Sequence, residues 1–204
     1  MKINAVNIKV RNMNSYQENR ARIAASMVLE FYASDFFRMK LLNTNLDELR
    51  GESKSSITKR VSSVSLYQIF MTGKEEWNNS EDYEIDLIVT RYRKNWSKVK
   101  GYIIPMKPTI HVNAKYFDTA TVLDIASNLC HEYSHTVGLT HSGKYLRESL
   151  PYLINEWVQI YFASESPITE HLNNLGDGIK TKRVCKRVWY KLWLGKTCYT
   201  KVIK

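Results

Sequence analysis

One eleven-residue segment, His-Glu-Tyr-Ser-His-Thr-Val-Gly-Leu-Thr-His from position 131, constrains this chain more than any other part of its sequence. Residues four apart lie on one face of a helix, so a helix here presents the imidazoles of His131 and His135 to one metal ion. Gly138 can adopt the left-handed conformation that ends a helix, and the reversed chain then brings His141 toward the same ion. The segment therefore predicts a three-histidine metal site that leaves one position open, as a catalytic zinc site requires.

Glu132 directly follows the first of these histidines and can reach a metal-bound water without being a ligand, where a general base must lie. The complete pattern, H-E-x-x-H-x-x-G-x-x-H, resembles the zinc signature of the metzincin metallopeptidases. This resemblance implies that His131, His135 and His141 bind zinc. It also implies that Glu132 is the general base of a zinc-dependent endopeptidase, whose substrate is a peptide or protein.

Metzincins also carry a Met-turn beneath the metal, commonly with a Tyr two residues after the Met. In this chain no Met follows the last histidine of the motif, and the best match is Ser149-Leu150-Pro151-Tyr152. Leu150 can supply the same apolar floor because Leu and Met are close in volume. By this resemblance Tyr152 is a candidate oxyanion stabiliser, and the alternative is an ordinary half-buried tyrosine.

Glu156 offers a different third ligand. It lies 21 positions after His135, the sort of separation at which the gluzincin class supplies a Glu from a second helix. This gluzincin-type zinc peptidase is the leading alternative, but it leaves Gly138 and His141 as coincidences. Glu156 could instead orient a ligating histidine from outside the ligand set.

Alternating apolar residues predict several strands. The N-terminal residues alternate and predict a strand rather than a signal peptide, because they contain no continuous apolar run. The clearest alternation is at residues 83–92, and residues 101–113 predict a hairpin or two short strands. A partial alternation at residues 61–72 also predicts a strand, whereas the polar residues 43–60 predict a loop.

Helical patterns fill much of the remaining chain. Residues 16–42 contain good helix formers with no Gly or Pro and predict one long helix. The active-site helix begins at Asp118 or Thr121, since residues 121–124 fit a capping box. A further helix is predicted from Pro151, because proline is favoured at the first helical position.

These elements predict an α+β fold in a single domain, residues 1–204. The metzincin resemblance implies a twisted, mostly parallel sheet with an antiparallel edge strand, together with a long N-terminal helix and an active-site helix. We expect these in residues 1–140 and a small C-terminal subdomain in residues 141–204. An exposed edge at residues 102–105 could pair with an extended peptide, or its prolines could serve only to prevent aggregation.

The net charge of +10 favours contact with anionic surfaces such as nucleic acid, acidic lipid or an acidic polymer. From Lys180 onward nine basic residues and no acidic one interleave with aromatic residues. This basic aromatic tail could bind an anionic polymer, and a catalytically silent binding protein that acts through it is the competing functional class. A packed amphipathic tail is the simpler alternative. We expect a monomer without a transmembrane segment.

The three cysteines allow different roles. Cys130 directly precedes the motif and is predicted to be a small buried residue that points away from the metal. Cys185 and Cys198 could form one disulfide in an oxidising compartment. The compartment itself does not follow from this pattern.

Overall fold

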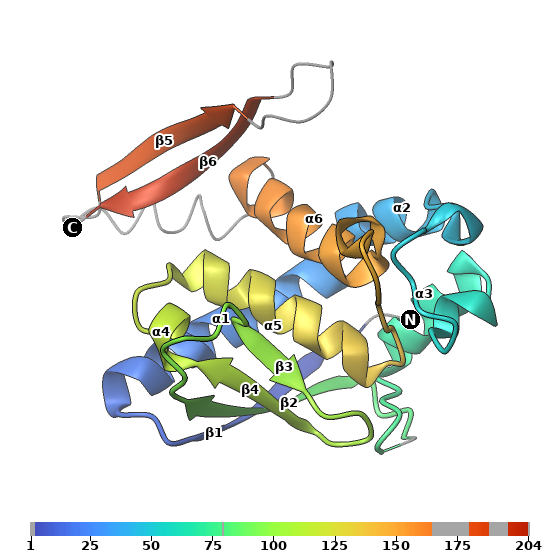
Figure 1. Ribbon diagram of the computed structural model, residues 1–204, viewed down its shortest axis with the longest axis horizontal. Helices are drawn as coiled ribbons and strands as arrows, with labels where there is room; N and C mark the ends of the chain where they lie inside the picture. The colour runs from blue at the N-terminus through green and yellow to red at the C-terminus, as the bar shows by residue number, and fades with distance from the viewer. Residues whose placement is uncertain (1–2, 79, 165–179, 188–195, 204) are drawn as a thin grey trace.

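The computed structural model describes residues 3–78, 80–164, 180–187 and 196–203, with side chains described for residues 3–78 and 80–163. The fold is α+β, as predicted, and contains a four-stranded mixed sheet with strand order β1-β2-β4-β3 (Figure 1). Three neighbouring strands are parallel: β1 (Ala5–Arg11), β2 (Glu84–Tyr92) and β4 (Thr109–Asn113). The short strand β3 (Gly101–Ile103) pairs antiparallel with β4 at the edge of this sheet.

Two helices, α1 (Ser15–Ala33) and α5 (Val122–Thr136), cover the same face of the sheet (Figure 1). The sheet buries alternate residues against them, among which Ile85, Leu87 and Val89 of β2 are at most 1% exposed. The helix α6 (Leu150–Ser164) packs on α5 from the side away from the sheet. The strand and helix predictions around the motif are therefore confirmed, including the capping box of α5 at Thr121.

The prediction of one long helix over residues 16–42 is wrong, because the helix breaks at Ser34. This residue has extended backbone angles (φ −76°, ψ 150°), and its hydroxyl accepts a hydrogen bond from the N–H of Phe37 at 3.0 Å. A new helix, α2 (Asp35–Leu42), begins there. Serine competes for backbone hydrogen bonds in this way, so it can start a helix inside a run of good helix formers.

The prediction of a strand over residues 61–72 is also wrong, since the segment forms α3 (Ser63–Thr72). Its N-terminus is capped by the Ser62 hydroxyl, which accepts from the N–H of Ser65 at 3.2 Å. Gly73 ends it with a left-handed conformation, φ +67°. Leu66 and Phe70, four residues apart, are its buried face, so the helical period overrides the partial alternation.

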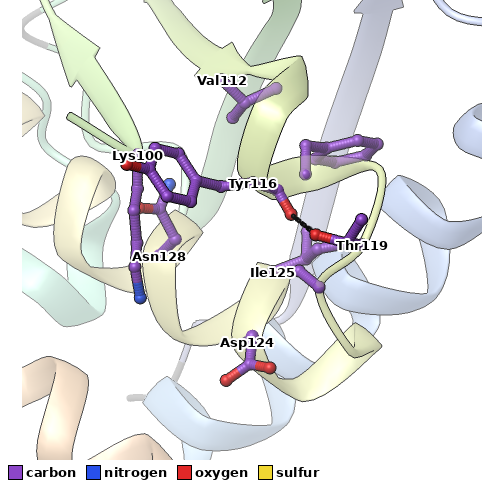
Figure 2. A pocket seen from close by; sticks show the side chains of 9 residues that line it. Lys100, Val112, Tyr116, Thr119, Asp124, Ile125 and Asn128 are labelled. Atoms are coloured by element: carbon purple, nitrogen blue, oxygen red, sulfur yellow. Dashed lines mark hydrogen bonds between the residues drawn. The ribbon is translucent and has the colours of Figure 1, made fainter. Parts of the chain in front are cut away.

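Short elements complete the fold: 3-10 turns η1 (Leu46–Glu48), η2 (Ile57–Lys59) and η3 (Leu146–Glu148), and the helix α4 (Ala114–Phe117). A hollow of about 210 Å³ lies between β4, α4 and the N-terminal half of α5 (Figure 2). Within the described ranges, no helix has the length and apolar character needed to span a bilayer.

Part of the predicted C-terminal tail is described. The strands β5 (Lys180–Arg187) and β6 (Lys196–Ile203) pair antiparallel, and their register places Cys185 opposite Cys198. The predicted disulfide itself concerns side chains outside the described residues, as do the tail tryptophans, Trp189 and Trp193.

Candidate metal centre

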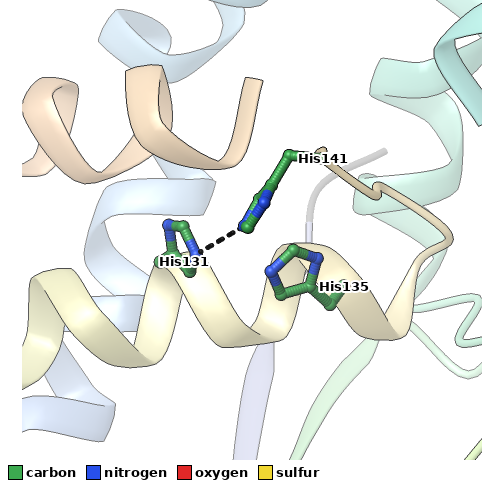
Figure 3. A group of neighbouring side chains, drawn as sticks. All are labelled: His131, His135 and His141. Atoms are coloured by element: carbon green, nitrogen blue, oxygen red, sulfur yellow. Dashed lines mark hydrogen bonds between the residues drawn. The ribbon is translucent and has the colours of Figure 1, made fainter. Parts of the chain in front are cut away.

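The three histidines of the motif come together at the C-terminal half of α5. His131 and His135 lie one turn apart on the helix, and His141 faces them from the chain that follows it (Figure 3). One nitrogen from each ring lies within 4.8 Å of the others, and the Nε2 atoms of His131 and His141 are 3.4 Å apart. Two ligands of a tetrahedral zinc ion are also about 3.4 Å apart, given zinc–nitrogen bonds of about 2.0–2.1 Å. The cluster can therefore hold a metal ion.

Backbone carbonyls orient both histidines of α5. Nδ1 of His131 lies 3.0 Å from the carbonyl oxygen of Pro151, and Nδ1 of His135 lies 2.6 Å from that of Leu139. Because a carbonyl oxygen can only accept a hydrogen bond, Nδ1 carries the proton in both rings. Nε2 then keeps its lone pair for a cation, as in histidines that bind zinc. This donor set fits zinc or another divalent transition metal.

Burial keeps these imidazoles neutral. Burial, with a smaller contribution from neighbouring imidazoles, lowers the pKa of His131 to about 3 and that of His135 to about 4. Burial also lowers the pKa of His141, although the charge of Glu52 acts in the opposite direction. Since neutral imidazole is the form that binds metals, the cluster can accept a cation at neutral pH without first losing protons.

Gly138 makes the turn that returns the chain to the metal site, as predicted. Its φ of +93° lies in the region that favours glycine, and its N–H donates to the carbonyl of His135 at 3.2 Å. A Cβ at this position would also come within 2.7 Å of the Glu76 carboxylate. A larger residue at position 138 would therefore disturb both the turn and its neighbour.

His141 is held by a segment that the sequence predicted only as a polar loop. Residues 51–57 run beside the turn after α5, and the N–H of Ser53 donates to the carbonyl of Thr140 at 3.0 Å. Glu52 and His141 form an isolated antiparallel bridge. The third histidine is thus fixed by main-chain pairing rather than by its own helix.

The Glu52 side chain is a functional candidate that sequence reasoning missed. It is 9% exposed and accepts hydrogen bonds from the N–H of Leu150 at 2.6 Å and the hydroxyl of Thr58 at 3.1 Å. Leu150 precedes Pro151, whose carbonyl orients His131. One buried carboxylate therefore connects the supports of two metal-site histidines. Its main-chain partner is 98 positions away, so no local pattern could have identified it.

Glu132 lies beneath the edge strand, beside the histidines. It is 4% exposed, and burial raises its pKa to about 8. The glycine at position 101 lets β3 lie close to two side chains of α5. A Cβ there would be 3.0 Å from Oε1 of Glu132 and 2.7 Å from Nδ2 of Asn128. A potential proton acceptor and a strand edge thus lie together at the metal cluster.

The two α6 candidates occupy different positions. The Tyr152 ring lies beside the cluster, with its centroid 4.8 Å from that of His131 and 5.2 Å from that of His141. Glu156 is exposed and is not part of the metal-binding group found among the described residues. Leu150 and Cys130 are fully buried in the core, and burial raises the pKa of the free Cys130 thiol.

The histidines open into a cleft of about 750 Å³ that runs between β3 and the helices α5 and α6. Tyr102 and Ile103 of β3 form part of one wall, and Tyr152, Asn155 and Arg147 form part of the other. The cleft therefore combines an apolar strand edge with polar groups near the metal cluster.

Comparisons with protein families, curated proteins and solved structures find no match to this chain.

Proposed function

We propose that this protein is a zinc-dependent endopeptidase of the metzincin type. One observation carries the proposal: three neutral imidazoles converge beside the buried carboxyl group of Glu132, in a cleft bordered by the edge strand β3. Metal ligands, a proton acceptor and a strand edge are the components that metal-assisted peptide hydrolysis requires.

His131, His135 and His141 would hold the zinc ion, which would supply Lewis acidity toward a peptide carbonyl and toward water. A cation at the three histidines would favour the ionised form of Glu132. As a carboxylate, Glu132 accepts a proton from the attacking water and returns it to the departing amine. The Tyr152 hydroxyl donates a hydrogen bond to the carbonyl oxygen as negative charge develops there.

Strand β3 positions the substrate in this mechanism. Its outer edge has no neighbouring strand in the described sheet, so its main-chain groups can pair with an extended peptide. Main-chain pairing aligns the scissile carbonyl independently of the substrate's side chains. Because Gly101 has no Cβ, this edge can lie close to the Glu132 carboxyl group.

Metal content and proteolysis test the proposal together. We expect one zinc per wild-type chain and hydrolysis of an unstructured protein such as casein that a chelator stops. Glu132→Gln should keep its zinc and lose about 10²–10⁴-fold in turnover, the usual contribution of a general base. Full activity in this variant would refute the proposal.

The same measurements separate the alternatives. His141→Ala should lose zinc, whereas retained zinc would identify Glu156 as the third ligand of a gluzincin-type site. A folded wild-type protein without zinc or proteolysis would favour a binding protein that acts through its basic tail.

A further inference from the structure

The metal cleft continues beyond the metal ligands along α5. The second hollow, between β4, α4 and α5, shares two of its lining residues, Lys100 and Asn128, with the metal cleft. Its lining includes the buried side chains of Val112, Phe117 and Ile125. A polypeptide in the cleft could therefore extend past the metal site and reach this hollow.

The segment that supplies the β3 side of both hollows is rich in basic residues. No Asp or Glu occurs between residues 91 and 117, from the end of β2 to the end of α4. The stretch contains seven cationic residues, and all except Arg91 are exposed: Arg91, Arg93, Lys94, Lys98, Lys100, Lys107 and Lys115. Arg91 is paired with Asp118 at 2.6 Å, so its charge is already compensated.

Lys98 and Lys100 are the two members of this group that line the metal cleft. Neither forms an ion pair or side-chain hydrogen bond with any described residue. Arg147 adds a third cationic side chain on the opposite wall. The ammonium groups of the two lysines are therefore available to an incoming anion.

Among the residues that the structure describes, no carboxylate near these hollows forms an ion pair with Lys98 or Lys100. The Asp124 carboxylate caps α5 by accepting hydrogen bonds from the N–H and hydroxyl of Thr121 at 3.2 and 2.7 Å. Glu76 lies beside Gly138, at the turn after α5, whereas Lys100 and Asn128 lie toward the start of that helix. Glu132 also lines the cleft near Asn128 but is only 4% exposed, so the exposed charges are cationic at this end of the cleft and acidic at the end with Glu76.

The loop that carries Lys98 and Lys100 has a fixed backbone. The buried Asn113 amide donates to the carbonyls of Lys94 and Val99 at 3.0 and 3.2 Å, and its main-chain N–H donates to the carbonyl of Lys100 at 2.8 Å. The Asn113 side-chain oxygen also accepts from the N–H of Lys94 at 3.2 Å. Both lysines therefore start from defined positions, which reduces the entropy lost when they bind a ligand.

We propose that the cleft selects polypeptide segments whose acidic side chains face Lys98 and Lys100 at the Asn128 end. This inference rests on the proposed peptidase function and names its substrate class. Two exposed ion pairs favour an acidic segment modestly, and the effect weakens as salt screens them. The acidic Glu76 at the opposite end gives the preference a direction along the cleft.

Binding to the full-length, zinc-loaded Glu132→Gln protein tests this preference without cleavage. Fluorescence anisotropy would compare labelled unstructured peptides that carry two Glu, two Gln or two Lys residues on one side of a constant centre. In a second set the two residues lie on the other side. Of the two Glu peptides, we expect only the one whose Glu residues face Lys98 and Lys100 to bind more tightly than its Gln counterpart. The difference should be about three- to tenfold at low ionic strength and less than about twofold in high salt.

Charge reversal provides the matched comparison. Lys98→Glu and Lys100→Glu should each reduce or reverse the preference for Glu over Lys peptides. Lys9→Glu changes the net charge equally on β1, at the far edge of the sheet, and should leave the preference unchanged. An equal effect of all three substitutions, or equal binding of the Glu and Gln peptides, would overturn the inference.

Wild-type kinetics then separate the two proposals. Hydrolysis of the Glu and Gln peptides with equal kcat/KM, together with equal binding, would leave a peptidase without this substrate preference. Lysine-dependent binding of acidic peptides without hydrolysis of any peptide would retain the preference and reject the peptidase.

Discussion

The carboxyl groups packed around α5 and the cationic groups beside β3 differ in their exposure to solvent. Around α5 three carboxyl groups are buried, those of Glu52, Glu75 and Glu132; each is at most 9% exposed, and of the three only Glu132 lines the cleft. On the β3 side the charges are cationic and almost all exposed, while the neutral amide of Asn113 holds the backbone. Buried carboxyl groups are therefore part of the internal framework around α5, whereas ammonium groups beside β3 are presented to solvent.

This difference suggests separate roles for the two groups: the buried carboxyl groups fix the geometry of the metal site, and the exposed cationic groups determine which ligands the cleft accepts. A buried carboxylate is costly to desolvate, and its hydrogen bonds tie it to particular partners, so it can fix distant segments relative to one another. An exposed ammonium group costs little and leaves the backbone unchanged when it is replaced. We expect substitutions on the α5 wall to alter stability and metal binding, and substitutions on the β3 wall to alter mainly what the cleft accepts.

The largest expected effect comes from removing Glu52. Glu52→Ala deprives the N–H of Leu150 and the hydroxyl of Thr58 of a charged acceptor, and should lower the free energy of unfolding by about 3 to 4 kcal/mol. Zinc affinity should fall about 10–100-fold, because the supports of His131 and His141 are loosened. Denaturant unfolding and zinc competition titration measure the two effects.

Glu48→Ala is the control for this substitution, since Glu48 is an exposed glutamate in the same connection. It should change neither quantity appreciably. A folded Glu52→Ala protein with wild-type zinc affinity would contradict the link between this carboxylate and the metal site.

Glu75 should make stability depend on pH. It lies beneath α5 and accepts from the Tyr133 hydroxyl at 3.3 Å, and burial raises its pKa from 4.5 to about 7. The fold thus favours the protonated form, so this contribution is fully present below about pH 4.5 and is lost as the pH rises to about 7. We expect a decrease of up to about 3 kcal/mol in the free energy of unfolding across this window.

Glu75→Gln cannot ionise and should lack this component. Chemical denaturation of both proteins at several pH values, with zinc present, isolates the difference from the titration of other groups. Parallel pH profiles would show that Glu75 does not carry the predicted charge penalty.

A smaller effect is expected from Asn113, on the opposite wall. Asn113→Ala removes the side-chain hydrogen bonds to Lys94 and Val99 and should lower the free energy of unfolding by about 2 kcal/mol. Hydrogen exchange should increase in residues 94–100, and the peptide charge preference should weaken, while zinc content stays the same. Asn95→Ala, an exposed neighbour, is the control. Loss of zinc from Asn113→Ala would show that the two walls are not independent.

Tyr152 should give the smallest effect. Its side chain is at the cleft and the residue is 36% exposed, so water can partly replace its hydroxyl. Tyr152→Phe should reduce kcat about tenfold, equivalent to about 1.4 kcal/mol, with zinc retained. Tyr145→Phe, at an exposed tyrosine that does not line the cleft, is the control. An unchanged kcat in Tyr152→Phe would remove this tyrosine from the mechanism.

The metal cluster could be predicted because its information is local. His131 and His135 are four residues apart on one helix. Gly138 indicates the turn after this helix that brings His141 close to the other two histidines. Strand β2 was equally clear, since Ile85, Leu87 and Val89 fall at every second position. Such short-range periods need no knowledge of the rest of the fold.

The errors arose where a local pattern was weak or competed with another. In α3 a few alternating apolar residues obscured the helical spacing of Leu66 and Phe70, and in the long N-terminal helix one capping serine, Ser34, created a break. Glu52 was missed because a single glutamate in a polar connection has no pattern of its own. Its role arises only when the fold brings Leu150 to it.

The brevity of β3 has a consequence for how a peptidase of this shape would attack folded proteins. The strand has only three residues, and alternate residues of an edge strand direct their main-chain groups outward. The strand can therefore form only a few main-chain hydrogen bonds with a substrate, too few to stabilise the unfolding of a segment from a stable domain. Cleavage of native proteins would follow their own local unfolding, so the first cuts should fall in fraying termini and mobile loops.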